Sequence, residues 1–109
     1  MIGPQGVHDL ADALKQNEGL TALNIYRNHI NNQGAQYIAN GLQQNQTLIS
    51  LDMRYNDIDV QGAEYFVNAL KVNKTLMTLD LGANPIDGQG KQLISKMHQT
   101  IPGRNVYFW

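Results

Sequence analysis

The 109-residue chain contains no cysteine, so it has neither disulfides nor thiolate metal ligands. It also lacks an excess of charge of either sign, because eight Lys and Arg residues face nine Asp and Glu residues, for a net charge of -1. Nucleic-acid-binding domains usually carry a basic patch and a high isoelectric point, so no nucleic-acid partner is expected. No apolar run approaches the ~18 residues that a membrane-spanning helix needs, so no membrane association is expected either.

A secretion signal is not recognisable, since residues 1–15 lack a basic start followed by an apolar stretch. Together with the absence of cysteine, this favours a cytoplasmic location. Two sequons, Asn45-Gln46-Thr47 and Asn73-Lys74-Thr75, would accept glycan in a secretory pathway. However, both occupy one position of an internal repeat, with Asn17 as a third copy. Asn at this position is expected to adopt the left-handed conformation that ends a helix, and we favour this capping role over glycosylation.

The internal repeat has a step of 28 residues and the pattern L-x-x-L-x-L/I/M-x-x-N-x-I, which begins at Leu20, Leu48 and Leu76. This pattern resembles the signature of the leucine-rich repeat family. Its length, with room for a full helix, makes it similar to the ribonuclease-inhibitor type, which also occurs in the sensor arms of NOD-like receptors, in Ran GTPase-activating proteins and in some bacterial effectors. The resemblance implies parallel strands on a concave face and helices on a convex face.

The predicted fold is α/β, a right-handed solenoid that forms a segment of a horseshoe, because strand–helix–strand crossovers are almost always right-handed. One domain, 1–109, would contain a partial repeat (1–18), three repeats (19–46, 47–74 and 75–102) and a terminal partial strand (103–109). We expect strands near 22–26, 50–54 and 78–82 and helices near 33–44, 61–72 and 89–99. The repeated Asn28, Asn56 and Asn84 should bond backbone groups at the turns that leave the strands.

Both ends of the chain are irregular in this register. The first residues enter in the middle of a repeat, which indicates a fragment or repeat arm of a larger protein. A further step of 28 makes 104–109 a closing strand, with Tyr107 and Trp109 pointing inward and Val106 and Phe108 on the concave side. This strand is either a natural cap or a cut through a longer protein. Its uncovered edge could support self-association.

Function in such a solenoid is expected at the outward positions of the strands. Tyr and Arg, which are enriched at interface hot spots, occur there beside two carboxylates. The sequence therefore predicts a non-enzymatic protein–protein interaction module, with a protein partner on the concave face. The predicted contact residues are Asn24, Tyr26, Arg27, Asp52, Arg54, Tyr55, Thr78 and Asp80.

No catalytic residue, metal site or cofactor is predicted. Asp52 and Asp80 should be neighbours, but no nucleophile or histidine accompanies them in the pattern, so we expect solvated carboxylates that pair with Arg54. The histidines at 8, 29 and 98 occupy unrelated repeat positions and should not converge on one metal. Two alternatives remain open: a regulator of enzyme activity (a GTPase activator or an enzyme inhibitor, as the resemblance implies) and a self-assembling structural repeat.

Overall fold

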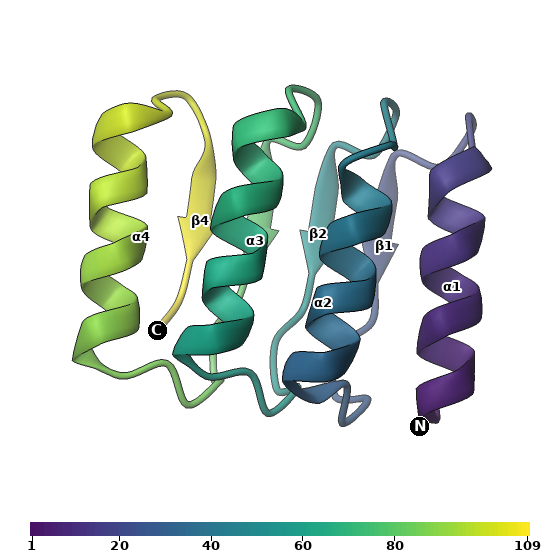
Figure 1. Ribbon diagram of the computed structural model, residues 1–109, viewed down its shortest axis with the longest axis horizontal. Helices are drawn as coiled ribbons and strands as arrows, with labels where there is room; N and C mark the ends of the chain where they lie inside the picture. The colour runs from purple at the N-terminus through teal and green to yellow at the C-terminus, as the bar shows by residue number, and fades with distance from the viewer.

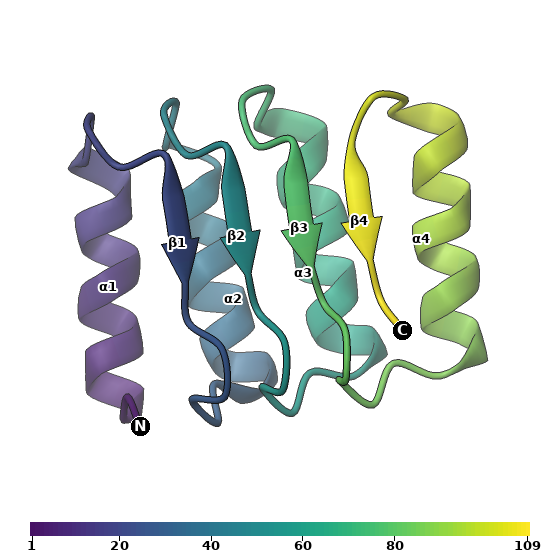
Figure 2. The same cartoon turned by 180° about the vertical axis from the view of Figure 1, so that it is seen from behind.

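The computed structural model describes residues 1–109 and consists of four helices that alternate with four strands (Figure 1). The strands form one parallel sheet in the order β1-β2-β3-β4, and the helices cover one face of it (Figure 2). The chain thus winds as the right-handed α/β solenoid that the repeat predicts. The elements are α1 (Pro4–Gln16), β1 (Ala22–Asn24), α2 (Asn31–Leu42), β2 (Ser50–Asp52), α3 (Val60–Val72), β3 (Thr78–Asp80), α4 (Gly88–Thr100) and β4 (Asn105–Tyr107).

The core lies between the sheet and the helices. It contains 25 buried apolar residues, drawn from every repeat. In α4, Ile94 and Met97 are buried at the positions that Phe66 and Ala69 occupy in α3. A glycine near each helix start packs against the isoleucine four residues earlier, and a Cβ at Gly34 would lie only 2.4 Å from Ile30 Cγ2. None of the helices is long and apolar enough to cross a bilayer.

The last strand departs from the 28-residue step. Ala22 pairs with Ser50, and Ser50 with Thr78, but Thr78 pairs with Asn105, which is one residue early. A one-residue shift moves every side chain of a strand to the other face of the sheet. The prediction that Tyr107 and Trp109 point inward is therefore wrong.

Val106 is instead 4% exposed in the core, whereas Tyr107 is 38% and Trp109 76% exposed. Phe108, which was expected on the concave side, is partly buried against the core. The physical reason is that the shortened register places the apolar Val106 and Phe108 inward and leaves the amphipathic ring of Tyr107 outside, which buries more apolar surface.

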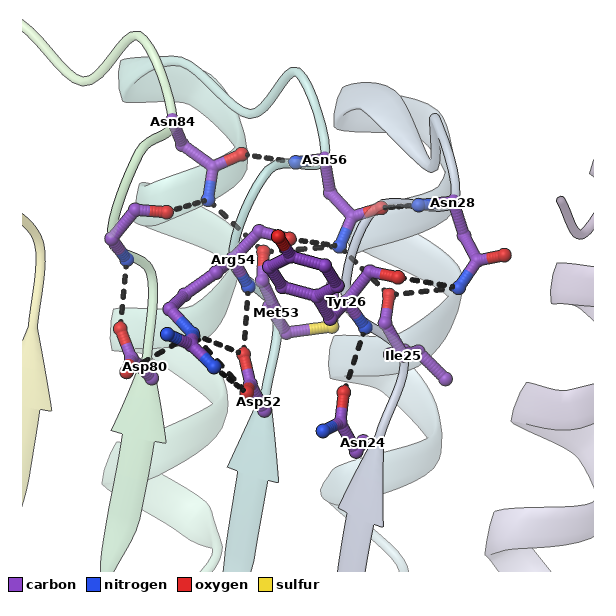
Figure 3. A network of polar contacts seen from close by, with 11 residues as sticks. Asn24, Ile25, Tyr26, Asn28, Asp52, Met53, Arg54, Asn56, Asp80 and Asn84 are labelled. Atoms are coloured by element: carbon purple, nitrogen blue, oxygen red, sulfur yellow. Dashed lines mark hydrogen bonds and ion pairs between the residues drawn. The ribbon is translucent and has the colours of Figure 1, made fainter.

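The predicted asparagine ladder runs along the turns that leave the strands (Figure 3). Its central member, Asn56, is fully buried. The Asn56 amide donates to the carbonyls of Ile25, Met53 and Arg54 at 3.0, 3.1 and 3.1 Å. Its Oδ1 accepts from the backbone N–H of Asn28 at 2.8 Å. Each asparagine thus satisfies backbone groups of two adjacent repeats, which regular secondary structure leaves without partners at these turns.

A second ladder lies at the opposite end of the strands and contains Asn17, Asn45 and Asn73. Asn45 Nδ2 donates to the carbonyls of Leu14 and Asn17, and its Oδ1 accepts from the backbone N–H groups of Thr47 and Leu48. Asn73 makes the same bonds one repeat later. Its Nδ2 donates to the carbonyls of Leu42 and Asn45, and its Oδ1 accepts from the backbone N–H groups of Thr75 and Leu76. These residues therefore connect successive repeats through their side chains.

The expected left-handed conformation is wrong for this position. Asn17 and Asn73 are extended, with φ of -77° and -75°. The capping role expected for the sequon asparagines is thus performed by the side chain and not by the backbone. Asn45 and Asn73 are each only 3% exposed, and their Nδ2 atoms are committed to buried carbonyls. A glycan at either atom is incompatible with this packing.

Arg104 completes the second ladder in the absence of a fourth asparagine. A step of 28 from Asn73 leads to Ile101, which has no polar side chain. The Arg104 guanidinium reaches back instead, and Nη2 donates to the Asn73 carbonyl. Arg104 is 8% exposed, and burial lowers its pKa from the usual range. An arginine side chain thus performs the role of the missing amide.

Candidate interaction face

The outward side chains of the strands form three rows across the concave face. Because neighbouring parallel strands lie about 4.8 Å apart, the members of a row are adjacent. The rows are Ala22, Ser50, Thr78 and Asn105; Asn24, Asp52, Asp80 and Tyr107; and Tyr26, Arg54, Gly82 and Trp109. The members of the first two rows that lie on β1, β2 and β3 line an open hollow on this face.

An ion-pair cluster lies at the border of the second and third rows (Figure 3). Arg54 makes a two-pronged contact with Asp52: Nε donates to Oδ1 at 3.0 Å and Nη2 to Oδ2 at 2.8 Å. Arg54 Nε also lies 3.6 Å from Asp80 Oδ2. The two carboxylates therefore share one guanidinium, as the sequence pattern suggested.

The hydrogen bond from Arg54 is the main reason that the pKa of Asp52 lies below the ordinary value of an aspartate. A carboxyl group with a depressed pKa contributes stability above its unfolded pKa and loses this contribution as the pH falls through the folded value. The Asp52–Arg54 pair is thus intact at neutral pH and is lost only in acid, below the ordinary aspartate pKa of about 3.9.

The same polar residues also fix the ends of the strands. Asn24, Asp52 and Asp80 each accept, through Oδ1, the backbone N–H two residues later, at 3.0, 3.1 and 2.9 Å. Side chains of this kind commonly form such local turns. The Asn24 side chain is therefore exposed but hydrogen-bonded to the backbone. The second row thus has a structural role beside any role in binding.

Next to the ion pairs, four side chains form one stacked array, in which Arg54 lies over Tyr26 and Arg27 lies against both Tyr26 and Tyr55. The guanidinium carbon of Arg54 lies 5.2 Å from the Tyr26 ring centroid. That of Arg27 lies 5.5 Å from the Tyr26 centroid and 5.1 Å from the Tyr55 centroid. The two rings meet edge to face at 5.3 Å. These distances fall in the range of favourable cation–π and aromatic contacts.

Seven of the eight predicted contact residues thus gather in one region, from Asn24 and the carboxylates to the stacked array. Thr78 belongs to the first row, outside this group of contacts, and lines the central hollow with Asn24, Asp52 and Asp80. Sequence reasoning missed Tyr107 and Trp109, which stack edge to face at 5.2 Å on the concave side. The alternation of apolar Val106 and Phe108 with Asn105, Tyr107 and Trp109 was the signal that could have placed them.

Gly82 explains how Trp109 reaches the third row. A Cβ at Gly82 would lie 2.6 Å from the Trp109 carbonyl oxygen and 3.0 Å from Asp80 Oδ1. The Trp109 carbonyl accepts the backbone N–H of Ala83 at 3.3 Å. The absence of a side chain at Gly82 therefore allows this close approach of two backbone segments.

The fold and this face define a repeat solenoid with one open sheet surface rich in aromatic and charged side chains. The sequence matches the profile of the Leucine Rich repeat over residues 16–39, 44–67 and 72–95, and the chain belongs to this family. No curated protein matches the sequence.

Two solved structures are similar to this chain in fold. One is Leiomodin-1 Actin-Binding Site 2, with 22% identity and a TM-score of 0.92 over 99% of this chain and 64% of that one. The other is the tropomodulin C-terminal domain of Caenorhabditis elegans, with 10% identity and a TM-score of 0.78 over 93% of this chain and 62% of that one. The chain thus spans less than two thirds of either structure. At these identities the likeness concerns the fold alone.

Proposed function

We propose that this chain is a non-enzymatic protein–protein interaction module, built from leucine-rich repeats of the ribonuclease-inhibitor type, and that it binds a protein partner on its concave face as a repeat arm of a larger protein. The observation that carries this proposal is the stacked array of Arg54, Tyr26, Arg27 and Tyr55. Exposed Tyr and Arg side chains of this kind are the residues most often found at interface hot spots.

The array favours binding for an energetic reason as well. Immobilising a flexible side chain at an interface costs about 0.5–1.5 kcal/mol. The four side chains already hold one another in place, and Arg54 is fixed further by Asp52. A partner that contacts this surface therefore incurs a smaller entropic cost than it would on a surface of free side chains.

We expect Arg54→Glu to weaken partner binding about thirtyfold, the equivalent of about 2 kcal/mol at a hot spot. The substitution removes a guanidinium and places a third carboxylate beside Asp52 and Asp80. The measurement is a titration of wild type and variant against a purified partner, with thermal unfolding of each to establish that the variant is folded. Lys71→Glu, on the exposed side of α3, is the matched charge reversal and should bind like wild type.

The opposite pattern would overturn the proposal. If Lys71→Glu loses binding while a folded Arg54→Glu retains it, the convex helices carry the interface.

A second candidate is actin as the partner, which is supported by the likeness of this chain to a structure named for actin binding. The test is calorimetric titration with monomeric actin and co-sedimentation with filaments. Saturable binding that Arg54→Glu weakens would support actin on the concave face. The absence of heat and of co-sedimentation at the highest soluble concentration would exclude it.

A further inference from the structure

The two arginines of the stacked array use their hydrogen-bond donors differently. Arg54 directs its donors to Asp52 and lies near Asp80. Arg27 lies against both the Tyr26 and the Tyr55 ring, but its side chain makes no hydrogen bond or ion pair within the protein. Its backbone is bonded, since its N–H donates to the Arg54 carbonyl at 3.0 Å. The Arg27 guanidinium is thus held in place while its donors remain available.

The contacts of Arg27 with the two aromatic rings use none of the hydrogen bonds that its guanidinium can donate to oxygen atoms. The five N–H donors lie in that plane and form a rigid fork that matches the two oxygens of a carboxylate. An arginine that two neighbouring rings hold in place is therefore organised in advance for bidentate recognition. Lysine, which has a flexible point charge, does not offer this geometry.

The repeat itself does not require a large side chain at this position. Arg27, Tyr55 and Ala83 occupy the same place in successive repeats, and all three have left-handed backbones, with φ of 57°, 57° and 54°. Ala83 shows that a methyl group satisfies the turn. Arg27 is exposed and is absent from the core. Packing therefore gives no reason for Arg27 and Tyr55.

The nearby carboxylates are already paired. Asp52 and Asp80 face Arg54, and Asp57 Oδ2 lies 3.0 Å from His29 Nδ1. Arg27 is consequently the cation of the array without a counter-charge. A single free guanidinium beside paired carboxylates, in a chain of net charge -1, suits one carboxylate and not a polyanion such as a nucleic acid.

We propose that Arg27 binds the carboxylate of an Asp or Glu side chain in an extended segment of a protein partner, and that Tyr26 and Tyr55 pack against the apolar residues that flank it. This rests on the proposed function, because it names the chemistry of the partner at the same face. The segment would lie across the lower rim of the sheet, where the strands end.

The test begins with a phage-displayed library of random 12-residue peptides, selected against the full chain. We expect enriched peptides to carry Asp or Glu beside an aromatic or aliphatic residue. A hydrogen bond to a charged group is typically worth a factor of ten or more in affinity. Binding should therefore weaken at least tenfold with Arg27→Gln and with Arg27→Lys, and it should be unchanged with the convex control Lys71→Gln.

A double-substitution cycle provides the sharper measurement. Replacing the acidic residue of the peptide by its amide should weaken binding as much as Arg27→Gln does, and the two changes together should cost no more than either alone. Unfolding midpoints of the variants should match wild type, because the Arg27 side chain is not part of the core.

Three outcomes overturn the proposal and separate it from the proposed function. In the first, the selected peptides lack acidic residues or bind Arg27→Gln as well as wild type, yet Arg54→Glu or Tyr26→Ala abolishes their binding. The concave face is then an interface, but Arg27 does not select a carboxylate. If Arg27→Lys binds like wild type, the fork geometry is not used. If no selected peptide depends on any concave residue, or none is selected, both proposals fail.

Discussion

Asn56→Ala is expected to destabilise the solenoid by about 3 kcal/mol or more, a large share of the 5–15 kcal/mol that holds a typical domain together. The variant leaves the carbonyls of Ile25, Met53 and Arg54 without their amide donor. It also removes the acceptor of the Asn28 N–H. Each buried polar group left unsatisfied costs about 1–3 kcal/mol. Urea unfolding followed by circular dichroism measures the loss.

The matched control is Asn68→Ala. Asn68 lies on the exposed side of α3, and alanine is the better helix former, so this variant should be as stable as wild type or slightly more so. Equal urea midpoints for the two alanine variants would show that the ladder contributes little to stability and would contradict the structural account of Asn56.

Val106→Asn is expected to cost about 2–4 kcal/mol, because it replaces a buried apolar side chain by a polar one without a partner. Val106 is 4% exposed in β4, at the place where a 28-residue register would have put an outward residue. The free energy of unfolding, obtained from urea titration, tests which face of β4 is buried.

Tyr107→Asn is the matched control for the register. Tyr107 is outward and loses only its contact with Trp109, so a cost of about 1 kcal/mol or less is expected. If Tyr107→Asn proves the more damaging of the two, the last strand follows the unshifted 28-residue step and its faces are reversed from those described here.

The three full repeats could be predicted because each position is specified several times over. The apolar spacing from Leu48 to Ile58 fixes both the strand and the turn, and Asn56 fixes the direction in which the chain leaves the sheet. The same pattern at Leu20 and Leu76 makes a chance match improbable. A parallel sheet with helices on one side then follows from the handedness of strand–helix–strand connections.

The last repeat could not be placed in the same way, because a single missing residue in the turn before β4 reverses every side chain after it. Alignment at a fixed step of 28 cannot detect a missing residue. The apolar character of Val106 and Phe108, which favours their burial, does indicate the shifted register. The role of Arg104 was hidden for a related reason. A long side chain can reach a carbonyl that a shorter asparagine would meet from another position in the sequence.

The outward residues of the strands could be predicted as a set, but the contacts among them could not. Alternation along β1, β2 and β3 placed Asn24, Asp52 and Asp80 outward without any knowledge of side-chain conformation. The packing of Arg27 against Tyr26 and Tyr55 depends instead on rotamers and on the left-handed backbone of the rim, which no sequence period specifies.

Hydrogen–deuterium exchange with a bound partner is the most direct test of binding on the concave face. The partner can be actin, if it binds, or a selected peptide fused to a carrier protein. We predict that slowed exchange is confined to 22–27, 50–55 and 78–83, the strands and their lower rim, while α2 (Asn31–Leu42) and α3 (Val60–Val72) exchange as in the free chain. Protection along these helices, with the strand segments unchanged, would contradict the account and place the interface on the convex face.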